Sequence, residues 1–260
     1  MGMGESPVST AEFDARGTGT APSGGVRTVL VVDTATDAVV TGIATITSGD
    51  AQPPVVTVLA DRTVADHRRH AELLTTLIGE TLTESGVGRG QLDAVVAGVG
   101  PGPFTGLRVG MATAAAFGDA LGLPVYGVCS LDAIAVEVAG AAPTASTIAV
   151  ATDARRREVY WALYTRTGRI RGPEVAAPAA VAADLDGTTP DAVGGSAPHL
   201  SQIGWTATEP ASTIPTVSGL ATAAAAAVLA RATPEPLVPL YLRRPDAVER
   251  KDQRPKSVTP

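Results

Sequence analysis

The segment from Val95 to Ala116 constrains the fold more than any other part of the sequence. An apolar run at residues 95–99 breaks into the loop Gly100-Pro-Gly-Pro-Phe-Thr105 and continues with helical spacing. That order predicts a strand, a tight loop and a helix. The loop glycines allow backbone angles that a side chain would forbid, and the prolines fix their own φ angles, so we expect a rigid loop. Thr105 is the candidate cap of the helix.

Small residues recur every four positions in this predicted helix, at Gly106, Gly110, Ala114 and Gly118. They form one stripe that another element could approach closely. The stripe either packs the helix against its own domain or belongs to a partner surface, and the sequence leaves both interpretations open.

A glycine-rich loop before a helix is also a candidate phosphate site, with Gly100, Gly102 and Thr105 as its residues, because a helix N-terminus presents free N–H groups. The support is weak. The segment contains no GxxxxGK[ST] pattern, its glycines do not fit GxGxxG, and its two prolines remove two donors.

Composition narrows the function classes. The net charge of −6 and the 3% of aromatic residues argue against a dedicated nucleic-acid surface, which needs clustered cations and stacking platforms. The single cysteine, Cys129, excludes an internal disulfide framework and suits a reducing cytoplasm; we expect it in the core. No apolar run is long enough to span a bilayer, so we expect no membrane contact.

Two segments share a pattern that indicates internal duplication. Val29–Asp33 and Ile148–Asp153 are apolar runs that end in aspartate, and each is followed six residues later by a second apolar segment. Strands at 28–33, 39–46 and 55–60 would form a meander in the first copy. We therefore expect two similar α/β lobes. For Asp33 a ligand role and a turn cap stay open, whereas for Asp153 we favour the turn cap.

Residues 66–85 predict a helix with Leu73, Leu74, Leu77 and Ile78 on one face. His67 and His70 lie three residues apart, and no HExxH or other ligand spacing accompanies them, so we expect no metal site. His199, the third histidine, falls in a stretch that we predict as a loop.

The chain resembles the TsaB (YeaZ) family, the scaffold subunits of the bacterial complex that makes threonylcarbamoyladenosine (t6A) in tRNA. The resemblance rests on Gly100–Gly110 and Pro124–Ala133, supported by Val31–Thr36 and Thr152–Trp161, and spans about residues 26–244. Pro103 stands where the family usually has serine.

The resemblance implies a two-lobed actin-like ATPase fold of the ASKHA, ribonuclease H-like type. It implies a non-catalytic subunit that pairs with a TsaD-type catalytic homologue through helices of the first lobe, while a TsaE-type ATPase joins them. The complex would transfer threonylcarbamoyl to adenosine 37 of ANN-decoding tRNAs, and this subunit would meet tRNA only through the complex. No cofactor is expected on this subunit alone; ATP or ADP and a metal ion belong to the partners. A homodimer in the absence of the partner stays open.

The resemblance also guides the choice of site residues. The catalytic relatives carry a His-x-x-x-His metal pair near residue 70, a spacing that this chain lacks. In the actin-like superfamily the aspartate after the first strand helps to hold a metal-nucleotide, a role that would fall to Asp33. We predict no catalytic residue. The predicted partner surface comprises His70, Leu73, Leu74, Leu77, Ile78, Gly106, Arg108, Gly110, Met111 and Ala114.

We expect a disordered N-terminal extension at residues 1–25, a first lobe at 26–140, a second, smaller lobe at 141–240 and a basic, flexible tail at 241–260. A predicted helix at 219–232 either stays with the second lobe or packs back on the first. We predict a helix that begins with Ser130 as its cap, a loop from Gly168 to Thr189 and a short strand near residues 191–196.

Two other functions stay open from the sequence. The chain could be a self-sufficient ATPase or kinase that uses Asp33 for metal and the 100–106 loop for phosphate. It could also be a metallopeptidase-like protein of the M22 type, which requires a bound metal ion.

Overall fold

A computed structural model describes residues 25–48, 53–65, 70–185, 189–206 and 212–243, and for residues 70–72 the backbone only. The predicted extension, the basic tail beyond residue 243 and His67 lie outside the described residues. The first half of the chain contains β1 (Val26–Asp33), β2 (Ala38–Thr47), β3 (Val55–Ala65), α1 (His70–Ser85), a short 3₁₀ helix (Arg89–Gln91), β4 (Ala94–Gly98), α2 (Phe104–Leu121), β5 (Val125–Val128) and α3 (Ser130–Ala141).

The first sheet has the strand order β3-β2-β1-β4-β5. β1, β2 and β3 form an antiparallel meander, and β4 and β5 continue the sheet parallel to β1. The predicted meander and the strand-loop-helix segment are confirmed. β1 is buried on both faces: Val29 and Val31 point to one core and Leu30 and Val32 to the other. This explains why its sequence is continuously apolar.

The second half contains β6 (Thr147–Asp153), β7 (Val159–Thr165), β8 (Gly168–Ala176), α4 (Pro178–Asp184), β9 (Ala192–Gly195), α5 (Ala197–Ile203) and α6 (Val217–Leu229). Its sheet has the order β8-β7-β6-β9, with β9 parallel to β6. This order repeats the β3-β2-β1-β4 part of the first sheet, so the predicted duplication is confirmed.

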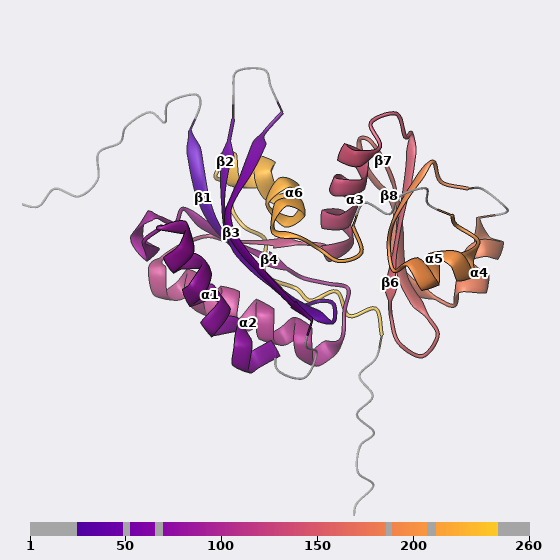
Figure 1. Ribbon diagram of the computed structural model, residues 1–260, viewed down its shortest axis with the longest axis horizontal. Coiled ribbons are helices and arrows are strands. Elements are labelled where there is room, and N and C mark those ends of the chain that lie inside the picture. The colour runs from indigo at the N-terminus through magenta and orange to yellow at the C-terminus, as the bar shows by residue number, and fades with distance from the viewer. Residues whose placement is uncertain (1–24, 49–52, 66–69, 186–188, 207–211, 244–260) are drawn as a thin grey trace, which may run out of the picture.

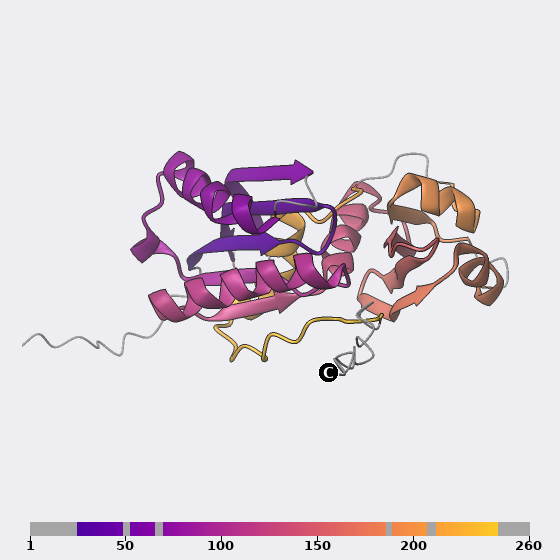
Figure 2. The same ribbon diagram turned by 90° about the horizontal axis from the view of Figure 1, so that it is seen from below.

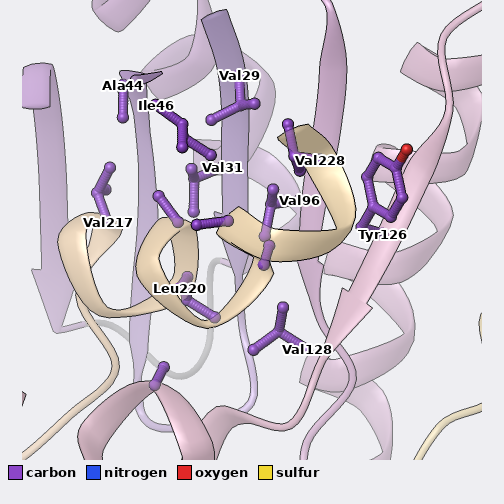
Figure 3. Packing of buried hydrophobic residues seen from close by; sticks show 14 of the residues in the cluster. Val29, Val31, Ala44, Ile46, Val96, Tyr126, Val128, Val217, Leu220 and Val228 are labelled. Atoms are coloured by element: carbon purple, nitrogen blue, oxygen red, sulfur yellow. The ribbon is translucent and has the colours of Figure 1, made fainter. Parts of the chain in front are cut away.

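The two sheets and their helices form successive layers along the molecule, with helices between the sheets and on both outer faces (Figure 1). α1 and α2 cover the outer face of the first sheet, and α4 and α5 cover the outer face of the second. Between the sheets, α6 packs on the first sheet, where Val217, Leu220 and Val228 meet the strands (Figure 3). α3 packs on the second sheet and against α6.

The loop predicted from Gly168 to Thr189 is wrong, because the structure places β8 and α4 there. β8 is an edge strand whose exposed side chains hide the alternation that would have marked it. Two predicted caps are also wrong. Pro103 and Cys129 hold the N-cap positions of α2 and α3, so Thr105 lies inside α2 and Ser130 begins α3.

After α6, residues 236–243 run without regular structure from the first lobe to the second (Figure 2). We call this segment the strap. Its Leu240 donates its backbone N–H to the carbonyl of Val99 at 2.9 Å, which attaches it to the end of β4. None of the helices in the described part of the chain has the length and apolar character needed to cross a lipid bilayer.

Candidate functional site

Asp33 lies at the carboxyl end of β1 and is fully buried. Its Oδ1 accepts from the backbone N–H of Ala35 at 2.8 Å, and its Oδ2 accepts from the hydroxyl of Ser130 at 2.5 Å. Burial raises the pKa of Asp33 from 3.8 to about 6, although both hydrogen bonds lower it. Because both oxygens are occupied inside the protein, Asp33 acts as an internal anchor between β1 and α3.

Other parts of the chain occupy the space beside the glycines of the central loop. Gly100 has φ +92°, a left-handed conformation that favours glycine. A Cβ on Gly102 would lie 2.0 Å from the carbonyl oxygen of Ala35, so the loop packs directly on the turn after β1. Thr105 is exposed on α2. Asp33 and these loop residues therefore do not fit a metal-nucleotide in the arrangement that the structure shows.

An inter-lobe pocket of about 340 Å³ opens beside this loop. Asp37 and Pro103 line it from the first lobe, and Asp153 and Arg155 line it from the second. Arg155 forms ion pairs with Asp37 across the pocket and with Asp153 in its own lobe. Asp33 is not among the lining residues, so the pocket and the buried carboxylate are separate features.

A serine, a histidine and an aspartate lie close together beside this pocket, which the sequence did not indicate: Asp153 and Ser196 line the pocket, and His199 lies next to both. His199 lies in α5 rather than in a loop, so that prediction is wrong. Its Nδ1 is 2.7 Å from Ser196 Oγ, and its Nε2 is 3.6 Å from Asp153 Oδ1. The second separation exceeds a hydrogen bond, and that oxygen already accepts from the N–H of Arg155 at 2.7 Å. The Ser196–His199 contact lies at the start of α5, and the three side chains do not have the geometry of a proton relay. Asp153 caps its turn, as predicted.

The glycine stripe of α2 faces inward. Gly106, Gly110, Ala114 and Gly118 are all buried. A Cβ on Gly110 would lie 2.3 Å from Thr34 Oγ1. That hydroxyl donates to the carbonyl of Gly106 at 2.7 Å and accepts from the N–H of Gly110 at 3.0 Å. The stripe therefore lets α2 approach its own β1, which decides between the two interpretations left open by the sequence.

The apolar face of α1 also points into the core. Leu74 and Ile78 are at most 1% exposed and Leu77 is 7% exposed, because they pack between α1 and the first sheet. Leu73 is half-buried at the margin. Seven residues of the predicted docking face are buried in the core of the lone chain: Leu74, Leu77, Ile78, Gly106, Gly110, Met111 and Ala114. The side chain of His70 lies outside the described part of the chain, and Arg108 is exposed.

The exposed positions of α1 and α2 include a different set of small side chains, beside charged residues such as Glu80 and Asp119. On α2, Ala112, Ala116 and Ala120 are exposed. On α1, Thr76 and Thr83 are exposed. The two helices lie against each other on one face of the sheet. We call this surface the α1/α2 face. The four-residue spacing of these alanines is visible in the sequence. The prediction instead chose the glycine stripe, which lies on the opposite side of α2.

Among the residues that the structure describes, no group of three or more histidine, cysteine, aspartate or glutamate side chains is placed to hold a metal ion. Cys129, expected in the core, is 8% exposed, and burial raises the pKa of its thiol to about 12.

The repeated strand order, with the two inner helices between the sheets, places this chain in the class of two-lobed actin-like α/β proteins. Comparisons with known proteins narrow the class. A family model described as TsaD, tRNA N6-adenosine threonylcarbamoyltransferase, matches residues 57–253. An uncharacterized protein of Mycobacterium tuberculosis is 48% identical over 222 residues, which cover 85% of this chain and 94% of that protein.

Two relatives carry informative names. The tRNA threonylcarbamoyladenosine biosynthesis protein TsaB of Haemophilus influenzae is 35% identical over 139 residues, which cover 54% of each protein. The solved structure of YeaZ from Pseudomonas aeruginosa matches with a TM-score of 0.61 and 26% identity, covering 83% of this chain and 100% of that chain. The chain belongs to this threonylcarbamoyltransferase-related family and, within it, to the TsaB (YeaZ) group.

Proposed function

We propose that this chain serves in t6A biosynthesis as a non-catalytic subunit that pairs with a TsaD-type homologue and supports threonylcarbamoyl transfer to adenosine 37 of ANN-decoding tRNAs. Family membership supports the pathway. The α1/α2 face supports the mode of action, because it offers a binding surface that the fold of the lone chain does not use.

The observation that carries the proposal is the character of this face. Exposed helix surfaces usually carry long charged side chains, yet the outward row of α2 is Ala112, Ala116 and Ala120. Thr76 and Gly79 continue the surface on α1, and a Cβ on Gly79 would meet no atom within 4 Å. Side chains this short allow the backbone of a partner helix to approach closely. The face therefore fits a helical partner.

The remaining elements of the proposal follow from the same family assignment. The TsaE-type ATPase joins the pair, the partners hold nucleotide and metal, and the complex works on tRNA in the cytoplasm. The acidic net charge of −6 supports tRNA contact through the partner rather than through this chain. Sedimentation of the chain alone tests the homodimer that the sequence leaves open.

We do not favour a self-sufficient ATPase or kinase, because both oxygens of Asp33 are engaged internally and the 100–103 loop packs on Ala35. A metallopeptidase would need a ligand set, and the described residues provide no such cluster.

The test combines binding and activity. The full chain is mixed with the TsaD-type homologue from the same organism, and association is measured by sedimentation with threonylcarbamoylation of tRNA as the second readout. Ala116→Glu places a charge in the α1/α2 face, whereas Ala180→Glu places the same charge on exposed α4 in the second lobe. We expect Ala116→Glu to weaken association about tenfold or more, which corresponds to about 1.4 kcal/mol, with unchanged thermal stability. Ala180→Glu should bind like the parent.

Equal binding by both variants would reject the α1/α2 face. A parent chain that neither binds the homologue nor stimulates the modification would reject the function itself.

A further inference from the structure

The strap connects the two lobes through separate sets of contacts. On the first lobe, Leu237 packs with Ala35, Leu107 and Met111 beside the central loop. The strap backbone bonds to Val99 at the end of β4. These contacts join the strap to the helix and loop that border the inter-lobe pocket.

A three-residue cluster fixes the strap to the start of α2. Phe104 and Tyr241 stack with their ring centroids 4.9 Å apart. The guanidinium of Arg108 lies 3.8 Å from the centroid of the Phe104 ring, and its Nε donates to the hydroxyl of Tyr241 at 2.6 Å. Arg108, which the sequence placed in the partner surface, is thus bound to the strap. It nevertheless remains exposed, so a partner can reach it.

The far end of the strap holds the second lobe. Leu240 and Leu242 pack against the core cluster that contains Cys129. Arg243 donates to the carbonyl of Ala154 at 2.8 Å and forms an ion pair with Glu158. Ala154 and Glu158 flank the turn between β6 and β7 that carries Arg155, the residue that pairs with Asp37 across the pocket.

We propose that the strap is a latch that keeps the two lobes closed over the inter-lobe pocket, and that the Arg108–Tyr241 contact is the point at which this latch opens. The strap bonds both to Val99, directly after β4, and to the β6–β7 turn, so releasing Tyr241 loosens its hold on the turn. The direct pair between Arg155 and Asp37 is solvent-exposed on both sides and adds little on its own.

The position of Arg108 connects the latch to the α1/α2 face. Arg108 precedes the exposed Ala112 by one helical turn, so a partner helix lying on Ala112 reaches the guanidinium. A partner that draws Arg108 away from Tyr241 opens the pocket as it docks. This coupling rests on the proposed function, whereas the latch itself is a property of the lone chain.

The protein contains its own reporter for the latch. Cys129 is the only cysteine of the chain, and it belongs to the buried cluster against which Leu240 and Leu242 of the strap pack. Its burial and raised pKa make the thiol unreactive while the strap is in place. The rate at which a thiol reagent such as dithionitrobenzoate modifies the native full chain therefore measures the population with an open strap.

Two substitutions form a matched pair. Tyr241→Phe removes the hydroxyl that binds Arg108, whereas Tyr126→Phe removes the hydroxyl that donates to the carbonyl of Ala232 at 3.0 Å, before the strap begins. We expect Tyr241→Phe to raise the Cys129 modification rate about three- to tenfold and Tyr241→Ala to raise it further, because ring stacking is also lost. Tyr126→Phe should react at the parent rate. All rates should change little in low urea, since the opening is local.

Unchanged Cys129 rates in both Tyr241 variants would overturn the latch. An increase that Tyr126→Phe reproduces, or one that climbs steeply with urea, would assign the reactivity to global unfolding and overturn it equally.

A second arm adds the TsaD-type homologue to the parent chain. A faster Cys129 reaction in the complex supports the coupling. Binding without a rate change rejects the coupling and leaves the docking function intact. Absence of binding rejects the docking function, and the latch is then judged by the Tyr241 variants alone.

Discussion

The hydroxyl of Ser130 donates to the buried carboxylate of Asp33 at 2.5 Å, although the two residues are 97 positions apart. The bond joins the end of β1 to the first residue of α3, the helix that leaves the first sheet and packs on the second. A carboxylate that could have been a ligand is instead the anchor at the point where the chain passes between the lobes.

This anchor makes stability depend on pH. Burial raises the pKa of Asp33 from its ordinary value of 3.8 to about 6 in the folded chain, so the folded state binds the proton more tightly than the unfolded state does. Its contribution to stability is therefore fully present below about pH 4, falls as pH rises through 6, and stays low above that. Two pKa units correspond to roughly 2–3 kcal/mol.

Asp33→Asn should remove this loss, because an amide can accept from Ala35 and donate to Ser130 Oγ without becoming charged. We expect the variant to gain about 2–3 kcal/mol of unfolding free energy relative to the parent between pH 4 and pH 7. Urea unfolding at a series of pH values measures this difference. Ser130→Ala is the companion variant and should lower stability at pH 7. Parallel pH profiles for Asp33→Asn and the parent would contradict the assignment.

The periodicity of a helix is predictable from the sequence, whereas the element against which its apolar face packs is not. The spacing of Leu74, Leu77 and Ile78 requires an apolar neighbour, but the same spacing fits the chain's own sheet or another protein. For α2 the choice depended on the close approach of Gly110 to Thr34, a contact between residues 76 positions apart that no local pattern reports. β1, β4 and β6 were predictable because they are buried strands with nearly continuous apolar sequences.

Other features were missed for definable reasons. β8 places arginine and glutamate among apolar residues that are half-buried or, in the case of Ile170, exposed, so its hydrophobic signal is weak. α5 is seven residues long, too short for a periodic pattern, although Pro198 in its first turn is a start signal that could have been used. The cluster of Phe104, Arg108 and Tyr241 joins α2 to the strap and has no local sequence signature.

Two helical glycines should respond in opposite directions to alanine. Gly110→Ala forces a methyl group against Thr34 and should cost about 1–3 kcal/mol of stability. Gly79→Ala meets no atom within 4 Å in the middle of α1 and should stabilise the chain by about 0.5–1 kcal/mol. Thermal or urea unfolding distinguishes the two. A stable Gly110→Ala would show that the stripe does not seat α2 against β1.

Thr34 supplies the hydrogen bonds at this same contact. Thr34→Val keeps the shape but leaves the N–H of Gly110 and the carbonyl of Gly106 without their buried hydroxyl partner, so we expect a loss of about 1–3 kcal/mol. Thr83→Val is the control: its hydroxyl donates to the carbonyl of Gly79 on the exposed side of α1, and its removal should change stability by less than about 0.5 kcal/mol. Equal losses in unfolding experiments would contradict a special role for Thr34.

A measurement of nucleotide binding distinguishes a non-catalytic subunit from a self-sufficient ATPase. Because Asp33 is engaged with Ala35 and Ser130 and the loop at Gly102 packs on Ala35, we expect the lone chain to show no heat of binding with magnesium-ATP at micromolar concentrations. Isothermal titration calorimetry on the parent and on Asp33→Asn tests this, and the two should give the same flat titration. The TsaD-type homologue, measured alone and with this chain, provides the positive control for the nucleotide preparation.

Saturable micromolar binding by the parent that Asp33→Asn abolishes would make Asp33 a ligand and reopen the ATPase alternative. Binding that Asp33→Asn retains would point to the inter-lobe pocket, whose lining does not include Asp33.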